Sequence, residues 1–489
     1  RYEPLILSNR SYITIHGLTF QDNGSYLTMS NGDYNIIEYC TFEDGAYCAT
    51  YGKWSGMLLD NGSNYNKFLH CTIMEHGYFT EDDDKGNMID IRSDYNLVED
   101  CEIYRGGHCP ITLVGDYNVV RDCYIHNEVW YEDYGDRCME IRMQTNYNLV
   151  EGNRMAFAAI PSDQNYADGI QLSGDHSIIR YNSYYENQGN GIKLTNFSTS
   201  TASYNHIYNN NFFHNGVETT REDDRCGIRI VEYEQYATPT GNVIINNIFY
   251  QNLGDTVGYT SASWSNRHLQ RIENNWNTGD PLFEDDESTL SPSNENLPDF
   301  DLQDSSQCID AGIHLTETNG SGSNSTSLVV DDAGFFSDGF GLVDADWIKI
   351  GDASPVQISD INYTNNTITL SSSRSWSDND EVWLYKDSRG NIVFKGNAPD
   401  LGATESDTTA TVQYSLSVST SGNGSVSLNP SGGTYDSGTQ VVLTATPDSG
   451  YQFDNWSGDL TGSSNPDTVL MNSNKSVTAN FSASTTNLL

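Results

Sequence analysis

Residues 35–42 read NIIEYCTF, and close variants of this stretch return through the first half of the chain. In each copy an Asn, once replaced by Ser, is followed five residues later by Cys or Asn. The eight anchor pairs are Asn35/Cys40, Asn66/Cys71, Asn96/Cys101, Asn118/Cys123, Asn148/Asn153, Ser177/Asn182, Asn205/Asn210 and Asn242/Asn247. A large apolar residue stands two positions after each pair, at Phe42, Ile73, Ile103, Ile125, Met155, Tyr184, Phe212 and Phe249. The repeat therefore predicts a short strand followed by a corner.

The copies lie 31, 30, 22, 30, 29, 28 and 37 residues apart, so the core unit has at most 22 residues and the excess forms loops. Such a period is typical of a solenoid, in which each unit buries its apolar face against its neighbours. β-branched and aromatic residues that alternate with period two favour strands over helices. Residues at one register then stack as ladders about 4.8 Å apart. We expect a Cys ladder in the first four coils and an Asn ladder in the next four, since stacked amides bond to one another.

This pattern resembles the right-handed parallel β-helix of polysaccharide lyases, pectinases, tailspikes and many bacterial surface proteins. The resemblance covers residues 1–317 and implies an all-β fold and export from the cell. The phrases DPLFEDD (280–286), DFDLQDSSQCIDAG (299–312) and APDLGATE (398–405) are similar to those that close secreted bacterial β-helices. Because YITIHGLTF (12–20) already lies in register, we expect a signal segment and an N-terminal cap ahead of the sequence given.

The remaining sequence divides by composition. TNGSGSNSTS (318–327) opens a segment, 318–397, whose alternation predicts a small β-barrel or sandwich inserted near the end of the solenoid, where it would serve as a cap. Residues 398–412 form a closing segment and linker. Residues 413–483 resemble the divergent internalin-type B repeat, which implies an extracellular, surface-displayed protein, and 484–489 are a tail. In this module Trp456 and Tyr451 are predicted to lie in the core, with glycan contact as the alternative.

The amino-acid composition limits the classes of molecule that the protein is expected to bind. The 489 residues include 24 basic and 67 acidic ones, for a net charge of -43, which argues against nucleic acid and anionic membranes. No window approaches the roughly 18 apolar residues of a membrane span. Nine cysteines leave at least one unpaired, and no CxxC pair indicates zinc. Cys109 and Cys138 precede the same strand in consecutive coils and can form a disulfide bond, with Cys226 at that position further on.

A second strand precedes the Asn anchor in seven coils, with the sequences MLLD, IDIR, ITLV, MEIR, IQLS, IKLT and IRIV. Alternation turns their second and fourth residues outward. The predicted outward stripe is Leu58/Asp60, Asp90/Arg92, Thr112/Val114, Glu140/Arg142, Gln171/Ser173, Lys193/Thr195 and Arg229/Val231. Four long insertions precede this strand and should wall the stripe into a groove. Their aromatic residues and carboxylates suit a polysaccharide, and the aromatic residues are Tyr78, Phe79, Trp130, Tyr131, Tyr134 and Tyr166.

Lys193 and Arg229 occupy one outward register in consecutive coils, about 5 Å apart. A β-eliminating lyase needs a base for the proton α to a uronate carboxylate and a cation for the enolate that forms. Adjacent cations favour the neutral amine that a base must be. The pair resembles that of the alginate lyase and chondroitinase B family, and GNGIKL resembles the segment that holds the catalytic Lys of calcium-dependent pectate lyases. The Lys-Ser and Leu-Arg-His-Gly phrases of the first family are missing, and the calcium aspartates of the second have no one-to-one match.

The predicted roles are therefore Lys193 as base, Arg229 and Arg142 as carboxylate binders, and Tyr131 or Tyr134 as acid. Arg92, Gln171, Trp130 and Tyr166 complete the predicted substrate-binding set. Asp168, Asp223 and Asp224 are the candidate ligands of Ca²⁺. Hydrolysis is the alternative chemistry, with Asp90 and Glu140 two coils apart as a carboxylate pair. His108 and His126 are further acid or base candidates.

The sequence thus predicts a secreted or cell-surface protein that engages an extracellular polysaccharide, with lyase cleavage of a uronate-containing glycan as its enzymatic form. A neutral or calcium-bridged glycan stays open. The alternative is a non-catalytic adhesin or a structural subunit of a surface fibre, since open solenoid ends and edge strands can pair with another copy to form filaments.

Overall fold

The computed structural model describes most of the chain. Within the described part, no helix is long and apolar enough to cross a membrane. Two compact units are present, residues 1–409 and 410–489. The described residues are 5–21, 27–43, 55–60, 62–76, 87–106, 109–126, 137–142, 145–159, 167–197, 199–216, 225–285, 297–407, 413–436 and 438–484.

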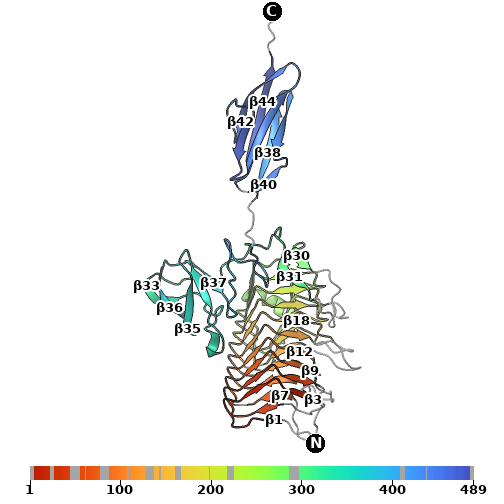
Figure 1. Cartoon of the computed structure of the whole chain (residues 1–489), viewed down its shortest axis with the longest axis vertical. Helices are drawn as coiled ribbons and strands as arrows, with labels where there is room; N and C mark the ends of the chain where they lie inside the picture. The colour runs from red at the N-terminus through yellow and green to blue at the C-terminus, as the bar shows by residue number, and fades with distance from the viewer. Residues whose placement is uncertain are drawn as a thin grey trace, which may run out of the picture. The chain divides into compact units, whose positions relative to one another are not determined.

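The first unit contains three long parallel sheets, as a β-helix requires (Figure 1). Sheet A consists of β1 Leu5–Ile6, β4 Leu27–Met29, β7 Ser55–Leu59, β10 Asn87–Ile91, β13 Ile111–Leu113, β16 Met139–Ile141, β19 Ile170–Leu172, β22 Ile192–Thr195, β25 Ile228–Val231 and β28 Val257–Tyr259. Sheet B consists of β2 Thr14–His16, β5 Ile36–Glu38, β8 Lys67–Leu69, β11 Leu97–Glu99, β14 Val119–Arg121, β17 Leu149–Glu151, β20 Ile178–Arg180, β23 His206–Tyr208, β26 Val243–Ile245 and β29 Arg271–Glu273. Sheet C consists of β3 Thr19–Gln21, β6 Thr41–Glu43, β9 Thr72–His76, β12 Glu102–Gly106, β15 Tyr124–His126, β18 Arg154–Ala156, β21 Ser183–Tyr185, β24 Asn211–Phe213 and β27 Ile248–Tyr250. The predicted all-β fold class and parallel β-helix are therefore confirmed.

Each anchor pair flanks a sheet B strand, and the residue before each anchor turns the corner. Tyr34 before Asn35 and Tyr39 before Cys40 have φ values of 57° and 53°, in the left-handed region that costs a residue with a Cβ about 1–2 kcal/mol. Ladder hydrogen bonds offset this cost. The Asn210 side chain donates to Asn247 Oδ1 at 3.0 Å and accepts from the backbone N–H of Asn182 at 3.0 Å. In the last coil, Gln270 accepts from the side chain of Asn242 and Asn275 accepts from that of Asn247, so the ladders of the two anchor positions continue there.

The solenoid interior is a continuous apolar core, and the anchor cysteines pack in it as predicted. Cys40, Cys71, Cys101 and Cys123 are buried, and their thiols donate to backbone carbonyls, as Cys71 does to Leu69 at 3.3 Å. The disulfide allowed for Cys109 and Cys138 is wrong, since neither cysteine belongs to a disulfide bond. They point to different carbonyls, of Ile111 at 2.9 Å and Ala156 at 3.3 Å, because an equivalent place in the repeat does not fix where a side chain points.

After β28 come α1 Ser261–Ser265 and η1 Arg267–Leu269, and the antiparallel pair β30 Phe283–Asp285 and β31 Asp299–Leu302 follows β29. This pair lies on the outward face of sheet C, where Phe300 contacts the rings of Tyr185 and Phe213 at centroid distances of 5.6 and 5.7 Å. Residues 308–312 then meet residues 397–401, with Gly312 N–H donating to the carbonyl of Pro399 at 2.8 Å. The chain between them leaves the solenoid and returns to it at one place.

That intervening chain forms a six-stranded sheet in the order β32-β37-β34-β35-β36-β33. Its elements are β32 Thr316–Glu317, β33 Gly322–Val329, η2 Gly339–Gly341, β34 Trp347–Ile350, β35 Val356–Asn362, β36 Thr367–Trp376 and β37 Glu381–Lys386. Its core residues share one apolar cluster with the outward residues Leu97, Val119, Leu149, Ile178, Val243 and Ile245 of sheet B. The domain therefore packs on the flank of the solenoid, and the predicted end cap is wrong, because the apolar surface that it covers lies along sheet B.

A fully buried ion network fixes this contact. Arg180 of sheet B donates to Glu151 at 2.6 Å and to both carboxylate oxygens of Asp346 at 2.7 and 2.8 Å. Burial raises the pKa of Asp346 even though the guanidinium of Arg180 lies against it. Arg121 adds a bond to the carbonyl of Ser388 at 2.7 Å, and Lys67 one to the carbonyl of Leu342 at 3.1 Å.

The second unit is a β-sandwich of two sheets, β40-β38-β44-β42 and β39-β41-β43. Its strands are β38 Gln413–Ser421, β39 Gly424–Asn429, β40 Thr434–Asp436, β41 Gln440–Pro447, β42 Tyr451–Gly458, β43 Asp467–Leu470 and β44 Lys475–Ala483. Trp456 is buried in the core between the sheets, as predicted, and its indole N–H donates to the carbonyl of Ser464 at 2.8 Å.

Candidate functional site on the outward face of sheet A

The central outward residues of sheet A form one straight row across adjacent coils, which we name the sheet A row. Its members, in order of hydrogen-bonded register, are Thr28, Leu58, Asp90, Thr112, Glu140, Gln171, Lys193, Arg229 and Gly258. Neighbouring strands set them about 4.8 Å apart. The alternation of the sequence places the same residues outward, so the structure brings the predicted set together on one face.

Paired charges occupy the middle of the row. Asp90 accepts from Nε and Nη2 of Arg92 at 2.9 and 2.7 Å, and this bond raises the pKa of Arg92. Glu140 accepts from Arg137 at 3.1 Å and from Arg142 at 3.0 Å. The predicted hydrolase carboxylates, Asp90 and Glu140, therefore stand two coils apart with each one held by arginine.

The hydroxyl of Thr112 lies between these two carboxylates. Thr112 is completely buried, and within the described residues its Oγ1 has no hydrogen-bond partner. An unsatisfied buried hydroxyl costs about 1–3 kcal/mol. The Thr112 hydroxyl therefore lowers the stability of the folded first unit.

The next part of the row is cationic. Lys193 and Arg229 are direct register partners, and each residue is only 6% exposed. Lys193 Nζ lies 3.9 Å from Asp168 Oδ2, while Asp168 Oδ1 accepts from the backbone and side-chain N–H groups of Asn190 at 2.9 and 2.7 Å. The Lys193 side chain therefore has Asp168 as an acidic neighbour and Arg229 as a basic neighbour in register. Gln171 links this part to the middle through a 3.3 Å bond to Glu140.

The calcium role predicted for Asp168 stays a prediction, and its carboxylate contacts Asn190 and Lys193. One of its oxygens is held by Asn190, and the other faces the ammonium of Lys193, where a calcium ion would meet a like charge. In the part of the chain that the structure describes, no three His, Cys, Asp or Glu side chains converge on a metal position. The other two predicted ligands, Asp223 and Asp224, lie outside that part.

The predicted aromatic wall also lies outside the described residues. This applies to Tyr78, Phe79, Trp130, Tyr131, Tyr134 and Tyr166, and to His108. His126 is described and stands on sheet C, where its ring stacks on Tyr104 at 4.7 Å, so it does not join the sheet A row.

Two positioning residues were missed by sequence reasoning. Arg137 holds Glu140, and Asn190 holds Asp168. Arg137 stands three residues before Glu140 and Asn190 three before Lys193, each at the entry to a sheet A strand. A search for polar residues at this equivalent entry position of each coil would have found both.

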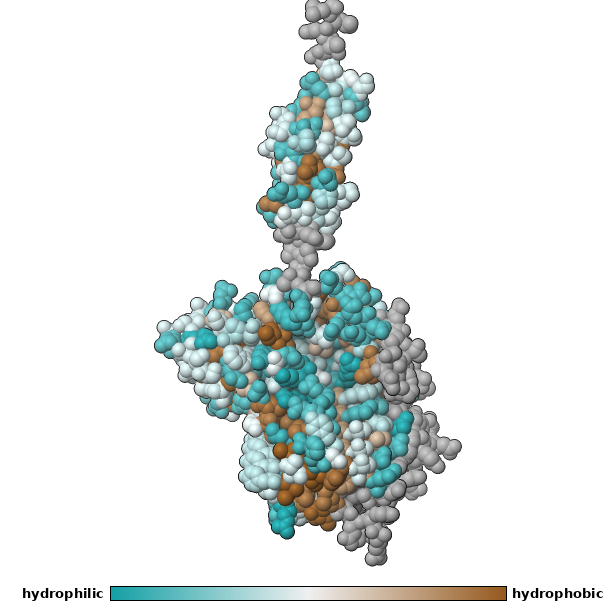
Figure 2. Space-filling model, in the orientation of Figure 1, coloured by the Kyte–Doolittle hydropathy of each residue, from teal (hydrophilic) through white to brown (hydrophobic). Residues whose placement is uncertain are grey.

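Figure 2 shows hydrophobic residues gathered on the visible face at the N-terminal end of the solenoid. The exposed large side chains of the first two coils are Ile6, Tyr12, Leu18, Tyr34 and Tyr39. The apolar surface of these coils therefore belongs to their strands and corners and not to the central part of the sheet A row.

Comparisons with known proteins agree with this architecture. Residues 78–231 match the family model of the right handed beta helix region, and residues 414–485 match the divergent InlB B-repeat domain. The chain therefore contains a right-handed β-helix and a divergent B-repeat. No curated protein matches the chain.

Several solved structures are similar to this chain at low identity. An alginate lyase from Paenibacillus sp. str. FPU-7 is 14% identical over 56% of this chain and 80% of that chain, with a TM-score of 0.30. The tailspike of E. coli bacteriophage HK620, in complex with a pentasaccharide, is 9% identical over 76% of this chain and 68% of its own, with a TM-score of 0.33. The Dettilon tailspike is 12% identical over 78% and 87%, with a TM-score of 0.32. At such identities the likeness concerns the fold alone.

Proposed function

We propose that this protein engages an extracellular polysaccharide along the sheet A row and cleaves it by β-elimination at Lys193 and Arg229. The observation that carries the proposal is the register pairing of these two cations beside a run of hydrogen-bonding side chains on one face. A solenoid presents such a row to a linear polymer over several sugar units, because every coil adds one side chain about 4.8 Å further along.

The chemistry follows from the two cations. Lys193 Nζ takes the proton from the carbon α to the uronate carboxylate, and the electron pair left on that carbon delocalises into the carboxylate. Arg229 stabilises the resulting enolate, and Arg142 binds a neighbouring carboxylate. The enolate then expels the glycosidic oxygen on the β carbon, which leaves a C=C bond in one product. The leaving oxygen takes a proton from an acid, for which Tyr131 or Tyr134 is our candidate.

The charge around Lys193 decides its role. As the base, Lys193 acts in its neutral form, and Asp168 Oδ2 lies 3.9 Å from its Nζ. If it stays protonated, it binds the substrate carboxylate. The overall charge of -43 opposes an anionic polymer, yet within a Debye length of about 8 Å the local cations dominate.

Calcium takes no step in this proposal, because Asp168 faces an ammonium. The assay nevertheless compares samples with calcium and with chelator, which tests the sequence-based expectation directly.

We also propose that the protein is secreted or displayed on the cell surface, with the divergent B-repeat as the attachment or spacer module. Release of the protein into culture medium, or its labelling on intact cells, tests this localisation.

The decisive experiment follows absorbance at 235 nm while purified protein acts on alginate, pectate, chondroitin and marine polysaccharides. We expect a rise with at least one uronate polymer. Lys193→Arg keeps the charge opposite Asp168, so it should fold and still bind polymer, but it cannot act as a base at neutral pH. We expect at least a hundredfold loss of rate with binding retained.

Lys475→Arg, at the start of β44 in the second unit, is the matched control and should keep full activity. Unchanged elimination by Lys193→Arg would contradict the assignment of the base. Reducing ends released without a 235 nm rise would favour hydrolysis at Asp90 and Glu140. Polymer binding without any cleavage would leave the adhesin or surface-fibre alternative, which electron microscopy for filaments then tests.

A further inference from the structure

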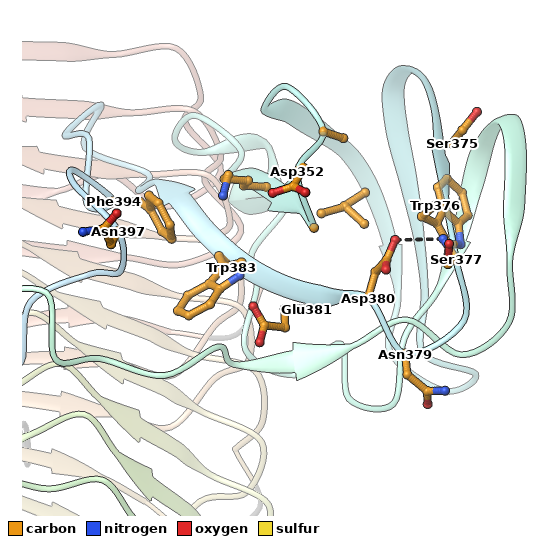
Figure 3. A pocket seen from close by; sticks show the side chains of 14 residues that line it. Asp352, Ser375, Trp376, Ser377, Asn379, Asp380, Glu381, Trp383, Phe394 and Asn397 are labelled. Carbon is orange, nitrogen blue, oxygen red and sulfur yellow. Dashed lines mark hydrogen bonds between the residues drawn. The ribbon is translucent and has the colours of Figure 1, made fainter. Parts of the chain in front are cut away.

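The inserted domain carries a cavity of its own, at the place where β34 and β36 end and β37 begins (Figure 3). The cavity measures about 810 Å³, within the range of roughly 300–1,000 Å³ that small-molecule sites occupy. It is formed by the ends of β34, β36 and β37 with the loop between β36 and β37, and by residues just after β37. None of its residues belongs to sheet A, and two of them, Ile350 and Trp376, are also members of the apolar cluster shared with sheet B.

Aromatic side chains form the walls of the cavity. Trp383 of β37 stands beside Lys349 of β34 in direct register, and its ring meets that of Phe394 edge to face at 5.2 Å. Trp376, on the β36 side, has its indole N–H fixed to the carbonyl of Gly320 at 3.0 Å. Both tryptophans are 8% exposed, so each offers a small ring surface that is rigidly held.

Polar side chains that can still form hydrogen bonds surround these rings. Within the described part of the chain, the side chains of Asp352, Asn379 and Asn397 make no hydrogen bond or ion pair, and all three are exposed. Glu381 is exposed as well, and one of its oxygens lies 3.6 Å from His314. Asp380 is fixed differently, by accepting from the backbone N–H of Ser377 at 2.8 Å, the bond drawn dashed in Figure 3.

One cation stands among these acceptors. Lys349 Nζ lies 4.6 Å from the centre of the Phe394 ring, and no carboxylate of the described residues is within ion-pair distance of it. Three carboxylates of the lining, Asp352, Asp380 and Glu381, outnumber this single ammonium. The cavity is therefore locally acidic, which disfavours a polyanion. The carboxylates do not converge on one point, so they form no metal site within the described residues.

Rigid aromatic edges, free amides and carboxylate acceptors together are the chemistry that binds hydroxyl-rich rings. Carboxylates and amides accept from sugar hydroxyls, the amides and Lys349 donate to them, and the aromatic walls contact the apolar C–H faces. We infer that the inserted domain holds a binding pocket for a short, neutral saccharide. This site is independent of the sheet A row, whose cations we assign to an acidic polymer.

The test is a titration of the full chain with mannotriose, cellotriose and galactotriose, followed by tryptophan fluorescence and calorimetry. Trigalacturonate and chitosan trimer serve as the anionic and cationic probes. We expect saturable binding of at least one neutral trimer, with a fluorescence change that Trp383→Phe removes. Asp352→Asn, Glu381→Gln and Asn397→Ala should each weaken binding by about tenfold, since each removes one hydrogen-bonding or charged contact.

Two controls separate this site from the proposed function. Asn365→Ala changes an exposed Asn in the turn before β36 and should bind normally, and so should Lys193→Arg of the sheet A row. Loss of binding in Lys193→Arg would move the saccharide to the sheet A row and overturn the inference. So would equal binding by the three pocket variants, failure of all neutral trimers, or binding of the charged trimers alone.

Discussion

Sheets A and B are built by the same coils, yet their outward faces differ in kind. On sheet A the outward positions carry Asp90, Glu140 and Lys193, which form ion pairs, and Arg229, the register partner of Lys193. On sheet B the equivalent positions carry Leu, Val and Ile, which the inserted domain covers. The difference teaches that inward residues make the coil, whereas outward residues decide what each face meets.

Charged groups occur on both faces, but they differ in burial and in the parts of the structure that they connect. The sheet B network of Arg180, Glu151 and Asp346 is completely buried and joins two parts of the first unit. The sheet A charges are held within the solenoid itself, and Arg92 remains exposed beside them. Buried pairs of the first kind are costly to break, whereas pairs near a surface contribute little.

The largest expected effect comes from breaking the sheet B network. Arg180→Ala leaves Asp346 and Glu151 buried without their cation, which should lower the free energy of unfolding of the first unit by about 3–5 kcal/mol. Arg142→Ala on sheet A is the matched arginine and should cost about 1 kcal/mol or less. Urea denaturation measures both. Equal losses would contradict the contrast between the two faces.

Truncation of the apolar docking face comes next. Leu149→Ala removes a fully buried outward side chain of sheet B from the core that the inserted domain shares, which should cost about 2–4 kcal/mol. Limited proteolysis should then cut the inserted domain faster. A loss below about 1 kcal/mol would mean that the domain is held by its polar contacts alone.

A substitution in the sheet A row should act in the opposite direction. Thr112→Val replaces a hydroxyl that has no partner by a methyl group of similar size, so we expect the first unit to gain about 1 kcal/mol in thermal or urea unfolding. Polysaccharide binding should weaken in the same variant. A stable variant with unchanged binding would remove Thr112 from the site.

The smallest effect concerns pH at the docking face. Burial raises the pKa of Asp332, but His206, whose Nε2 lies 2.8 Å from the carboxylate, outweighs it, so the pKa is lowered overall. A lowered folded-state pKa gives stability above the unfolded value of about 3.9, and this stability is lost as pH falls further. Because Asp332 is 41% exposed, we expect less than about 1 kcal/mol. Asp332→Asn should flatten the stability profile between about pH 2 and 4, and an unchanged slope would contradict this.

Much of the solenoid can be predicted from the sequence, because the alternation of apolar residues and the spacing of the Asn anchors are local patterns. The sequence predicts the β-helix, the Cys and Asn ladders and the members of the sheet A row from Leu58 to Arg229. It also holds a signal that we did not use. In NLVEDC and NVVRDC both the first and second strand residues are apolar, so Leu97 and Val119 turn a hydrophobic side chain outward and indicate a covered face.

Other features have no local signal. Arg180 and Asp346 meet across 166 residues, and no period links an insertion to the strand that it covers. The partners of Lys193 depend on side-chain direction, which the repeat leaves open, so the contact with Asp168 could not be predicted. The same limit explains the wrong disulfide of Cys109 and Cys138. The roles of the row residues stay predictions, since position alone does not define chemistry.

One measurement tests most directly whether the sheet A row is the working face of the solenoid. Calorimetric titration of alginate and pectate into the wild type is compared with Arg229→Gln in the row and Arg374→Gln on the exposed part of the inserted domain. We expect Arg229→Gln to weaken binding at least tenfold and Arg374→Gln to leave it unchanged. Equal affinities for all three proteins, or a loss confined to Arg374→Gln, would contradict the assignment.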